Sequence, residues 1–133
     1  LIAMSLGNPA LAMVTSKFTD FDSATMVAGA STMAGSMWHG TRTQHIRAGI
    51  EAEGYDLDYL ERAWSDLAPA NHVKSLANKD VKLIVSTTDE ITPSRYQEEL
   101  VDAARAAGIE PTVQRTRLGH YAVTGKYCLY GPL

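Results

Sequence analysis

The apolar positions of this chain recur with two periods, and the change of period predicts strands that alternate with helices. Four short segments have the pattern of strands: residues 1–4, 24–30, 81–86 and 112–116. The run at 81–86 is rich in β-branched side chains, which is typical of a strand buried on both faces. Because alternating strands and helices form parallel sheets covered on both faces, we expect an α/β fold.

The helix predicted over residues 93–107 has the clearest signals in the chain. Its apolar side chains share one face: Tyr96, Leu100, Ala103, Ala104 and Ala107. We expect Thr92 to cap its start and Gly108 to end it. Further helices are predicted at residues 9–14 and in a final segment that reaches about Tyr130.

Residues 31–77 contain helical pieces and no strand, so they interrupt the alternation. One helix is expected at 43–53 and another at 56–67, where Asp56 is placed to cap the start and Pro69 follows the end. The chain therefore divides into a core segment at 1–30, a helical insertion at 31–77 and a second core segment at 78–133.

The bulk composition excludes several classes of function. With 133 residues, 45% of them hydrophobic, the chain is long enough for one domain with a core. A formal net charge of -3 with dispersed basic residues disfavours nucleic-acid binding. No apolar run approaches the roughly 20 residues of a membrane span, and no signal-peptide pattern is recognisable. The sequence carries no visible address, so the location stays unknown, with the cytoplasm weakly favoured. Cys128 has no partner for an internal disulfide, and no Cys/His spacing resembles a zinc site.

Three polar residues follow predicted strands, namely Ser5, Asp89 and His120. The carboxyl ends of parallel strands meet at one edge of a sheet, where sites of α/β proteins lie. Serine becomes a nucleophile when an imidazole takes its proton and a carboxylate orients that imidazole. The three residues therefore form a candidate catalytic set.

Each of these residues also has an ordinary structural interpretation. Ser5 could cap the helix that follows it, and Asp89 could form a turn, with Glu90 as the nearest competing carboxylate. His120 could be an exposed loop histidine. The order and the local context of the three residues favour the catalytic interpretation.

The same segments resemble the α/β-hydrolase superfamily. The stretch Ala3-Met4-Ser5-Leu6-Gly7 is similar to its nucleophile elbow, G-x-S-x-G, with Ala3 in place of the first glycine. Residues 86–93 resemble the acid turn of the superfamily, and residues 118–121 resemble its Gly-His loop. The chain order Ser, Asp, His is also that of the superfamily.

The resemblance implies a partial α/β-hydrolase fold, a mostly parallel sheet flanked by helices, in which residues 31–77 stand in the place of the helical lid. The chain begins inside the strand that feeds the elbow, so the N-terminal strands of that fold are expected to be missing. We accordingly expect a partner, which would be the missing N-terminal half, a second chain or another copy of this chain.

The resemblance also implies a chemistry without metal or organic cofactor. Ser5 would attack a carbonyl, His120 would move the proton, and Asp89 would hold the imidazolium. The backbone N–H of Leu6 would be one oxyanion donor. The second donor of the superfamily comes from an early loop that this sequence lacks, and loss of one donor costs on the order of a hundred-fold or more in rate.

Large soft side chains in the expected lid, together with one residue beside His120, form a candidate substrate pocket: Met33, Met37, Trp38, His39 and Tyr121. Packing of the lid on the body would explain many of them equally well. The predicted function is hydrolysis of a carboxylic ester or related acyl bond. An acyltransferase, a thioesterase or a non-catalytic module completed by a second chain are the alternatives.

Overall fold

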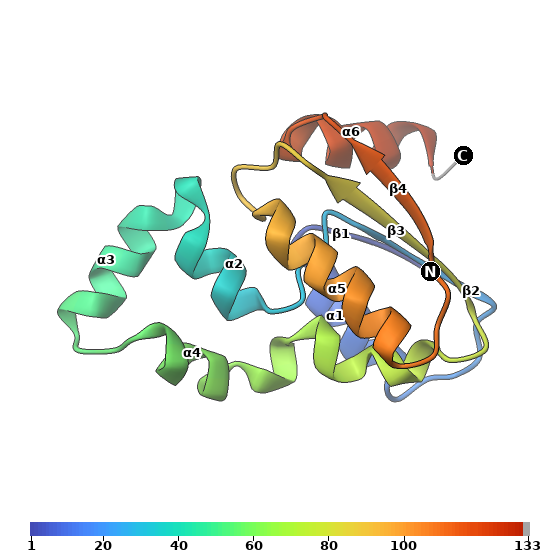
Figure 1. Cartoon of the computed structure of the whole chain (residues 1–133), viewed down its shortest axis with the longest axis horizontal. Helices are drawn as coiled ribbons and strands as arrows, with labels where there is room; N and C mark the ends of the chain where they lie inside the picture. Colours follow the sequence, from blue (N-terminus) through green and yellow to red (C-terminus); the bar gives the residue numbers. More distant parts are fainter. Residues whose placement is uncertain (132–133) are drawn as a thin grey trace.

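A computed structural model describes residues 1–131 of the chain. Within these residues, four parallel strands form one sheet in the order β1-β2-β3-β4, which confirms the predicted parallel architecture (Figure 1). The strands are β1 (Ile2–Met4), β2 (Ser23–Val27), β3 (Asp80–Ser86) and β4 (Thr112–Thr116).

Helices cover both faces of this sheet. One face is packed by α1 (Gly7–Thr15), the 3₁₀ helix η3 (Pro69–Leu76) and α5 (Ser94–Ala106), and the other by α6 (His120–Tyr130). The two faces follow from the alternation of side chains along a strand. Leu83 and Val85 join the cluster under α5, whereas Ile84 between them packs with Val123 and Tyr127 of α6.

The helices between β2 and η3 form what we call the helical arm, residues 33–67, which extends away from the sheet (Figure 1). It consists of α2 (Met33–His39), the 3₁₀ turn η1 (Thr41–Thr43), α3 (Gln44–Ala52), α4 (Leu57–Ala63) and the 3₁₀ turn η2 (Ser65–Leu67). Ala34, Trp38 and Leu60 form a small cluster of their own. The arm thus has its own apolar contacts, separate from the core of the sheet.

Several local predictions are confirmed, and others are wrong. Asp56 caps α4, because its Oδ1 accepts the Tyr59 N–H at 2.8 Å. Thr92 does not cap α5: the residue at the cap is Pro93, and Thr92 is buried. His120, expected in a loop, is the first residue of α6.

The second strand also ends earlier than the predicted 24–30. It stops at Val27 because Ala28 has a positive φ of 48°, which is incompatible with continued pairing as a strand. The turn that follows redirects the chain toward α2. Residue 28 is thereby placed at the carboxyl edge of the sheet, beside the candidate site.

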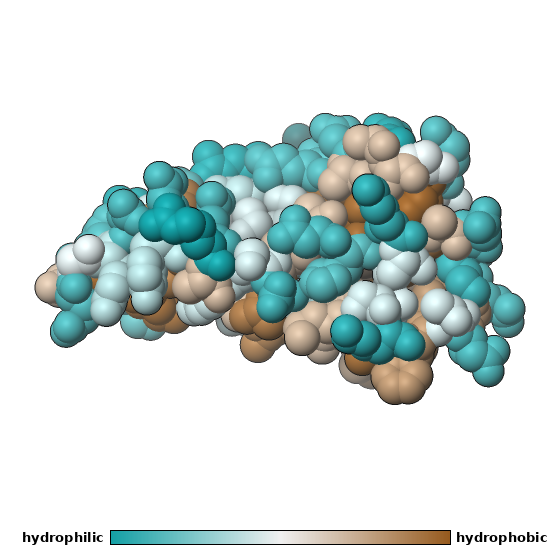
Figure 2. Space-filling model, turned by 90° about the horizontal axis from the view of Figure 1, so that it is seen from below, coloured by the Kyte–Doolittle hydropathy of each residue, from teal (hydrophilic) through white to brown (hydrophobic). Residues whose placement is uncertain are grey.

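The β1 strand lies at one edge of the sheet and pairs only with β2 within the described residues. Large apolar side chains are exposed on β1, α1 and the segments that flank them: Leu1, Ile2, Leu6, Met13, Val14 and Phe18. Figure 2, which views the molecule from below, shows hydrophobic patches along the lower border of the outline. No helix within residues 1–131 is both long enough and apolar enough to cross a membrane.

Candidate active site

Ser5 occupies the sharp turn between β1 and α1. Its φ is 48°, a left-handed conformation that non-glycine residues seldom adopt and that often marks functional sites. The Ser5 N–H donates to the carbonyl of Val27 at 2.9 Å, which ties the turn to the end of β2. The side chain of Ser5 lines a cavity at this edge of the sheet.

Asp89 follows β3 and has a fully buried side chain. One carboxylate oxygen, Oδ1, accepts the backbone N–H groups of Ile91 and Thr92, each at 2.8 Å. This local turn is a common use of aspartate. It leaves the other oxygen, Oδ2, directed toward His120.

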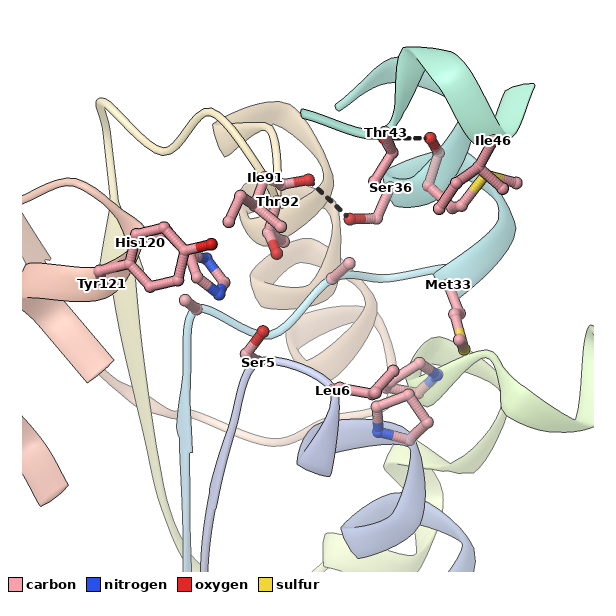
Figure 3. A pocket seen from close by; sticks show the side chains of 15 residues that line it. Ser5, Leu6, Met33, Ser36, Thr43, Ile46, Ile91, Thr92, His120 and Tyr121 are labelled. Atoms are coloured by element: carbon pink, nitrogen blue, oxygen red, sulfur yellow. Dashed lines mark hydrogen bonds between the residues drawn. The ribbon is translucent and has the colours of Figure 1, made fainter. Parts of the chain in front are cut away.

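His120 and Asp89 are in direct contact, with 2.7 Å between His120 Nδ1 and Asp89 Oδ2. Because a carboxylate only accepts hydrogen bonds, we assign the proton to Nδ1, which leaves Nε2 as the basic nitrogen. Figure 3 shows the Ser5 hydroxyl directed into the cavity, at the end where the His120 ring lies. No hydrogen bond joins Ser5 to His120 within residues 1–131, and such contacts commonly tighten only when substrate binds.

Hydroxyl groups at the end of β3 form hydrogen bonds between the two loops that carry Asp89 and His120. Ser86 Oγ donates to the carbonyl of Leu118 at 2.5 Å. Thr87 Oγ1 donates to Thr116 at 3.1 Å, and Thr88 Oγ1 donates to Arg117 at 2.8 Å. The run Ser86-Thr87-Thr88 therefore holds the two loops side by side.

Gln97 completes the surroundings of Asp89, and the sequence analysis missed it. Its side chain is 2% exposed on α5, and its Nε2 donates to Thr92 O at 2.7 Å and lies 3.3 Å from Asp89 Oδ2. Its Oε1 accepts the Ser86 N–H at 2.8 Å. The one sequence feature that could have indicated Gln97 is its position directly after Tyr96, at the border of the apolar face of α5.

The cavity above Ser5 has a volume of about 430 Å³. Met37 lines it. So do Leu6, Met33, His120 and Tyr121, which are labelled in Figure 3. Ile46, Pro9, Pro69 and Ile91 add further apolar surface, and the lining contains no Asp, Glu, Lys or Arg among the described residues. The site therefore combines an imidazole and a hydroxyl with an uncharged apolar wall.

Two residues expected in the pocket lie outside this lining. Trp38 is 7% exposed because it packs against Leu60 inside the arm. His39 turns toward α5, where its Nδ1 lies 2.8 Å from the Tyr96 hydroxyl. Burial raises the pKa of that hydroxyl, which is therefore a neutral partner for the imidazole.

The Tyr96 ring also explains how closely the arm approaches the body. A Cβ at Gly35 would lie 2.5 Å from the Tyr96 ring, so only glycine lets α2 come this near. Ser36 Oγ reaches the carbonyl of Ile91 at 3.5 Å, a bond drawn in Figure 3. These contacts place Met33 and Met37 of α2 over the edge of the sheet.

A second hollow of about 240 Å³ shares Ile91, His120 and Tyr121 with the cavity and is lined by polar residues as well. Arg42 and Glu90 contribute to it and form an exposed ion pair at 3.6 Å. Within residues 1–131, no cluster of three or more His, Cys, Asp or Glu side chains could hold a metal ion.

Comparisons with known proteins identify the fold. No protein-family model matches the chain, and no curated protein sequence is significantly similar to it. Solved structures do match. An acylaminoacyl peptidase of Pyrococcus horikoshii superposes with a TM-score of 0.72 at 16% identity, over 93% of this chain and 20% of that one. A puromycin-hydrolyzing peptidase of Mycobacterium tuberculosis superposes with a TM-score of 0.68 at 18% identity, over 90% of this chain and 18% of that one.

An esterase domain of a Rhodothermus marinus protein matches with a TM-score of 0.62 at 17% identity, over 95% of this chain and 54% of that one. The chain thus spans about a fifth of the two peptidases and about half of the esterase domain. All three neighbours have the α/β-hydrolase fold, and this chain has part of that fold. The predicted fold class is confirmed.

Proposed function

We propose that the chain carries the catalytic residues of a serine hydrolase, with Ser5 as nucleophile, His120 as general base and Asp89 as the group that orients the imidazole. The observation that carries this proposal is the buried 2.7 Å contact between His120 Nδ1 and Asp89 Oδ2, at the sheet edge where Ser5 also lies. The fold, the strand-end positions and the order of the three residues agree with it.

The reaction would proceed through an acyl-enzyme. Ser5 Oγ attacks the carbonyl carbon while its proton passes to His120 Nε2, and the leaving group then departs with that proton. In the second half of the reaction, water attacks the acyl-enzyme and gives a proton to Nε2. The acyl group is released as an acid, and Ser5 regains a proton from Nε2. Asp89 Oδ2 accepts the Nδ1–H of the imidazolium.

Leu6 supplies one oxyanion donor in this proposal. Its N–H stands at the start of α1, where backbone N–H groups have no partner within the helix and the helix dipole favours negative charge. A second donor would come from another part of the fold. We therefore expect this chain to react on the order of a hundred-fold more slowly than one with both donors.

The shape of the site supports an uncharged, apolar acyl group as the substrate moiety. The cavity of about 430 Å³ offers thioether and aliphatic surface and, among residues 1–131, no charged lining residue for a free amino group or carboxylate. The leaving group would lie in the second hollow beside His120, which returns the proton to it. The helical arm, residues 33–67, acts as the lid in this proposal. The expected lid segment 31–77 is longer because it includes η3, which packs on the sheet as part of the body.

The experiment compares p-nitrophenyl esters with p-nitroanilides that carry the same acyl group, and N-acetylphenylalanine derivatives with those of free phenylalanine. We expect turnover of the neutral acyl esters, a preference for N-acetyl over free-amine substrates, and a loss of about a thousand-fold or more in Ser5→Ala. Turnover that Ser5→Ala leaves unchanged would contradict the proposal. The ester-to-anilide ratio decides between an esterase and a peptidase.

A separate observation supports an assembly role. Within residues 1–131, one edge of β1 is unpaired, and this edge with its exposed apolar neighbours is typical of a sheet that pairs with further strands. We propose that this edge binds the rest of an α/β-hydrolase sheet or, without it, another copy of the chain. Light scattering after size exclusion is expected to show association, and a compact, folded monomer would rule it out.

A further inference from the structure

Asn8, in the first turn of α1, has a side chain that is completely buried. Buried amides are nearly always hydrogen-bonded, and this one bonds to two backbone carbonyls. Its Nδ2 donates to the carbonyl of Ser5 at 2.8 Å and to that of Val27 at 3.0 Å. Its backbone N–H also donates to the Ser5 carbonyl, at 3.0 Å. One residue thus bridges the turn that carries Ser5 and the end of β2.

This bridge acts on a strained segment. Ser5 has a φ of 48°, and such a conformation persists only where the surroundings over-determine it. The Val27 carbonyl accepts both the Ser5 N–H and the Asn8 amide, so the same oxygen fixes the two sides of the turn. Loss of the amide would leave two buried carbonyls with fewer donors and would let the turn relax.

Gly29 leaves room for the amide on the other side. A Cβ at position 29 would lie 2.9 Å from Asn8 Cγ and 3.0 Å from Asn8 Oδ1, closer than a real Cβ approaches. Within residues 1–131, Asn8 Oδ1 is the one buried side-chain polar atom without a hydrogen-bond partner. Its place against Gly29 is therefore set by packing, while Nδ2 makes the two bonds.

Building on the proposed function, we propose that Asn8 is a positioning residue that holds the Ser5 hydroxyl in its reactive place. Asn8 is not part of the cavity lining and does not face a substrate there. Its effect passes through the backbone of Ser5. Small displacements of a nucleophile have large effects on rate, because a shift of about 1 Å can cost on the order of a hundred-fold.

The first test compares Asn8→Ala and the isosteric Asn8→Asp with Thr15→Val as a matched control. Thr15 is also completely buried on α1, and its hydroxyl bonds to Ala12 and Ser75, far from the elbow along the helix. The readout is the rate constant for labelling of Ser5 by a fluorophosphonate. We expect both Asn8 variants to label about ten- to a hundred-fold more slowly, and the control to stay within about two-fold.

Gly29→Ala provides a second route to the same group, because the added methyl displaces the Asn8 amide without removing it. We expect Gly29→Ala alone to slow the labelling, and to have little further effect in an Asn8→Ala background, since the displaced group is then absent. Equal effects of Gly29→Ala in both backgrounds would contradict the proposal. If the Asn8 variants do not fold, Gly29→Ala alone still tests the proposal, because a folded Gly29→Ala chain that is labelled as fast as the unmodified chain would contradict it.

A third readout does not depend on catalysis. Hydrogen exchange measured by NMR reports the bond from the Ser5 N–H to Val27, and we expect Asn8→Ala to accelerate it at least about ten-fold more than Thr15→Val does. If the unmodified chain is not labelled, the proposed function fails, and this exchange rate alone decides on Asn8. The proposal is overturned if Asn8→Ala matches the control in both labelling and exchange.

Discussion

The body and the helical arm of this molecule are built differently. The body buries a large cluster between its sheet and the helices α1, η3 and α5, and a second one under α6. The arm has one small cluster of three buried residues, and α3 buries none of its side chains. Ser5, Asp89 and His120 all belong to the body, whereas Met33, Met37 and Ile46 bring the arm to the cavity.

Because the body is tightly packed and the arm is not, the two regions suit different roles. Groups that react must be held within a fraction of an ångström, which requires elements fixed by packing and by hydrogen bonds to buried partners. Groups that select a substrate need contact and shape, and a loosely packed element can supply these. The body therefore suits the chemistry, and the arm suits recognition of the acyl group.

The largest expected effect compares the same substitution in the two regions. Leu100 of the body is 2% exposed, and Leu60 of the arm is 5% exposed. We expect Leu100→Ala to lower the free energy of unfolding by about 3–5 kcal/mol, and Leu60→Ala by about 2 kcal/mol or less, because the small cluster of the arm can collapse around the gap. Chemical denaturation measures both. Equal losses would show that arm and body are packed alike.

Gln97 tests how firmly the body holds Asp89. In Gln97→Glu, the new buried carboxyl lies beside Asp89 and its pKa is raised. Below that pKa the protonated group still donates to Asp89, and above it the two charges repel. We expect Ser5 labelling relative to the unmodified chain to fall about ten-fold or more as the pH rises. Gln44→Glu adds the same charge at an exposed position and should show no such trend.

Met37 tests the role of the arm. Met37→Ala enlarges the cavity and removes apolar contact, so we expect preference to shift toward longer acyl esters by a few-fold, with labelling by a small fluorophosphonate unchanged. Met13→Ala makes the same chemical change on α1, outside the cavity lining. If Met37→Ala lost labelling and ester turnover to the same extent, the arm would take part in the reaction itself and not only in substrate recognition.

The smallest effect concerns the ion pair that joins α5 to β4. The Arg115 guanidinium donates to Glu98 at 2.7 and 2.8 Å and lowers the pKa of that carboxyl below its ordinary value of 4.5. This stabilisation is present above pH 4.5 and disappears as the pH falls through the lowered pKa. Because both side chains are partly exposed, we expect Glu98→Gln to cost only about 0.5 kcal/mol at pH 7. Denaturation at several pH values should show the difference vanish in acid.

The order of elements and the three strand-end residues could be predicted from the sequence, because strand periodicity is local and parallel strands end at one edge. Gln97 and Asn8 could not be predicted. Asn8 donates to the carbonyl of Val27, 19 residues away, and Gln97 accepts the N–H of Ser86, 11 residues away. Nothing in the local pattern shows which of these backbone groups will be near. A buried amide on a helix is recognisable only after the fold is known.

Some of the pocket residues could likewise be predicted from the sequence, and others could not. Met33, Met37 and Tyr121 line the cavity, whereas Trp38 and His39 do not. Helical residues that follow one another point in different directions, so a run of large side chains cannot all face one cavity. Which of them faced the body depended on how α2 packs against Tyr96, and that contact depends on the small size of Gly35.

The most direct test of the proposed triad is fluorophosphonate labelling of the folded chain, followed by intact mass and peptide mapping, with Ser5→Ala and His120→Ala as controls. The account predicts a single adduct on Ser5 that is lost in Ser5→Ala and reduced about a thousand-fold or more in His120→Ala. A folded chain that is not labelled, or that is labelled equally well without His120, would contradict it.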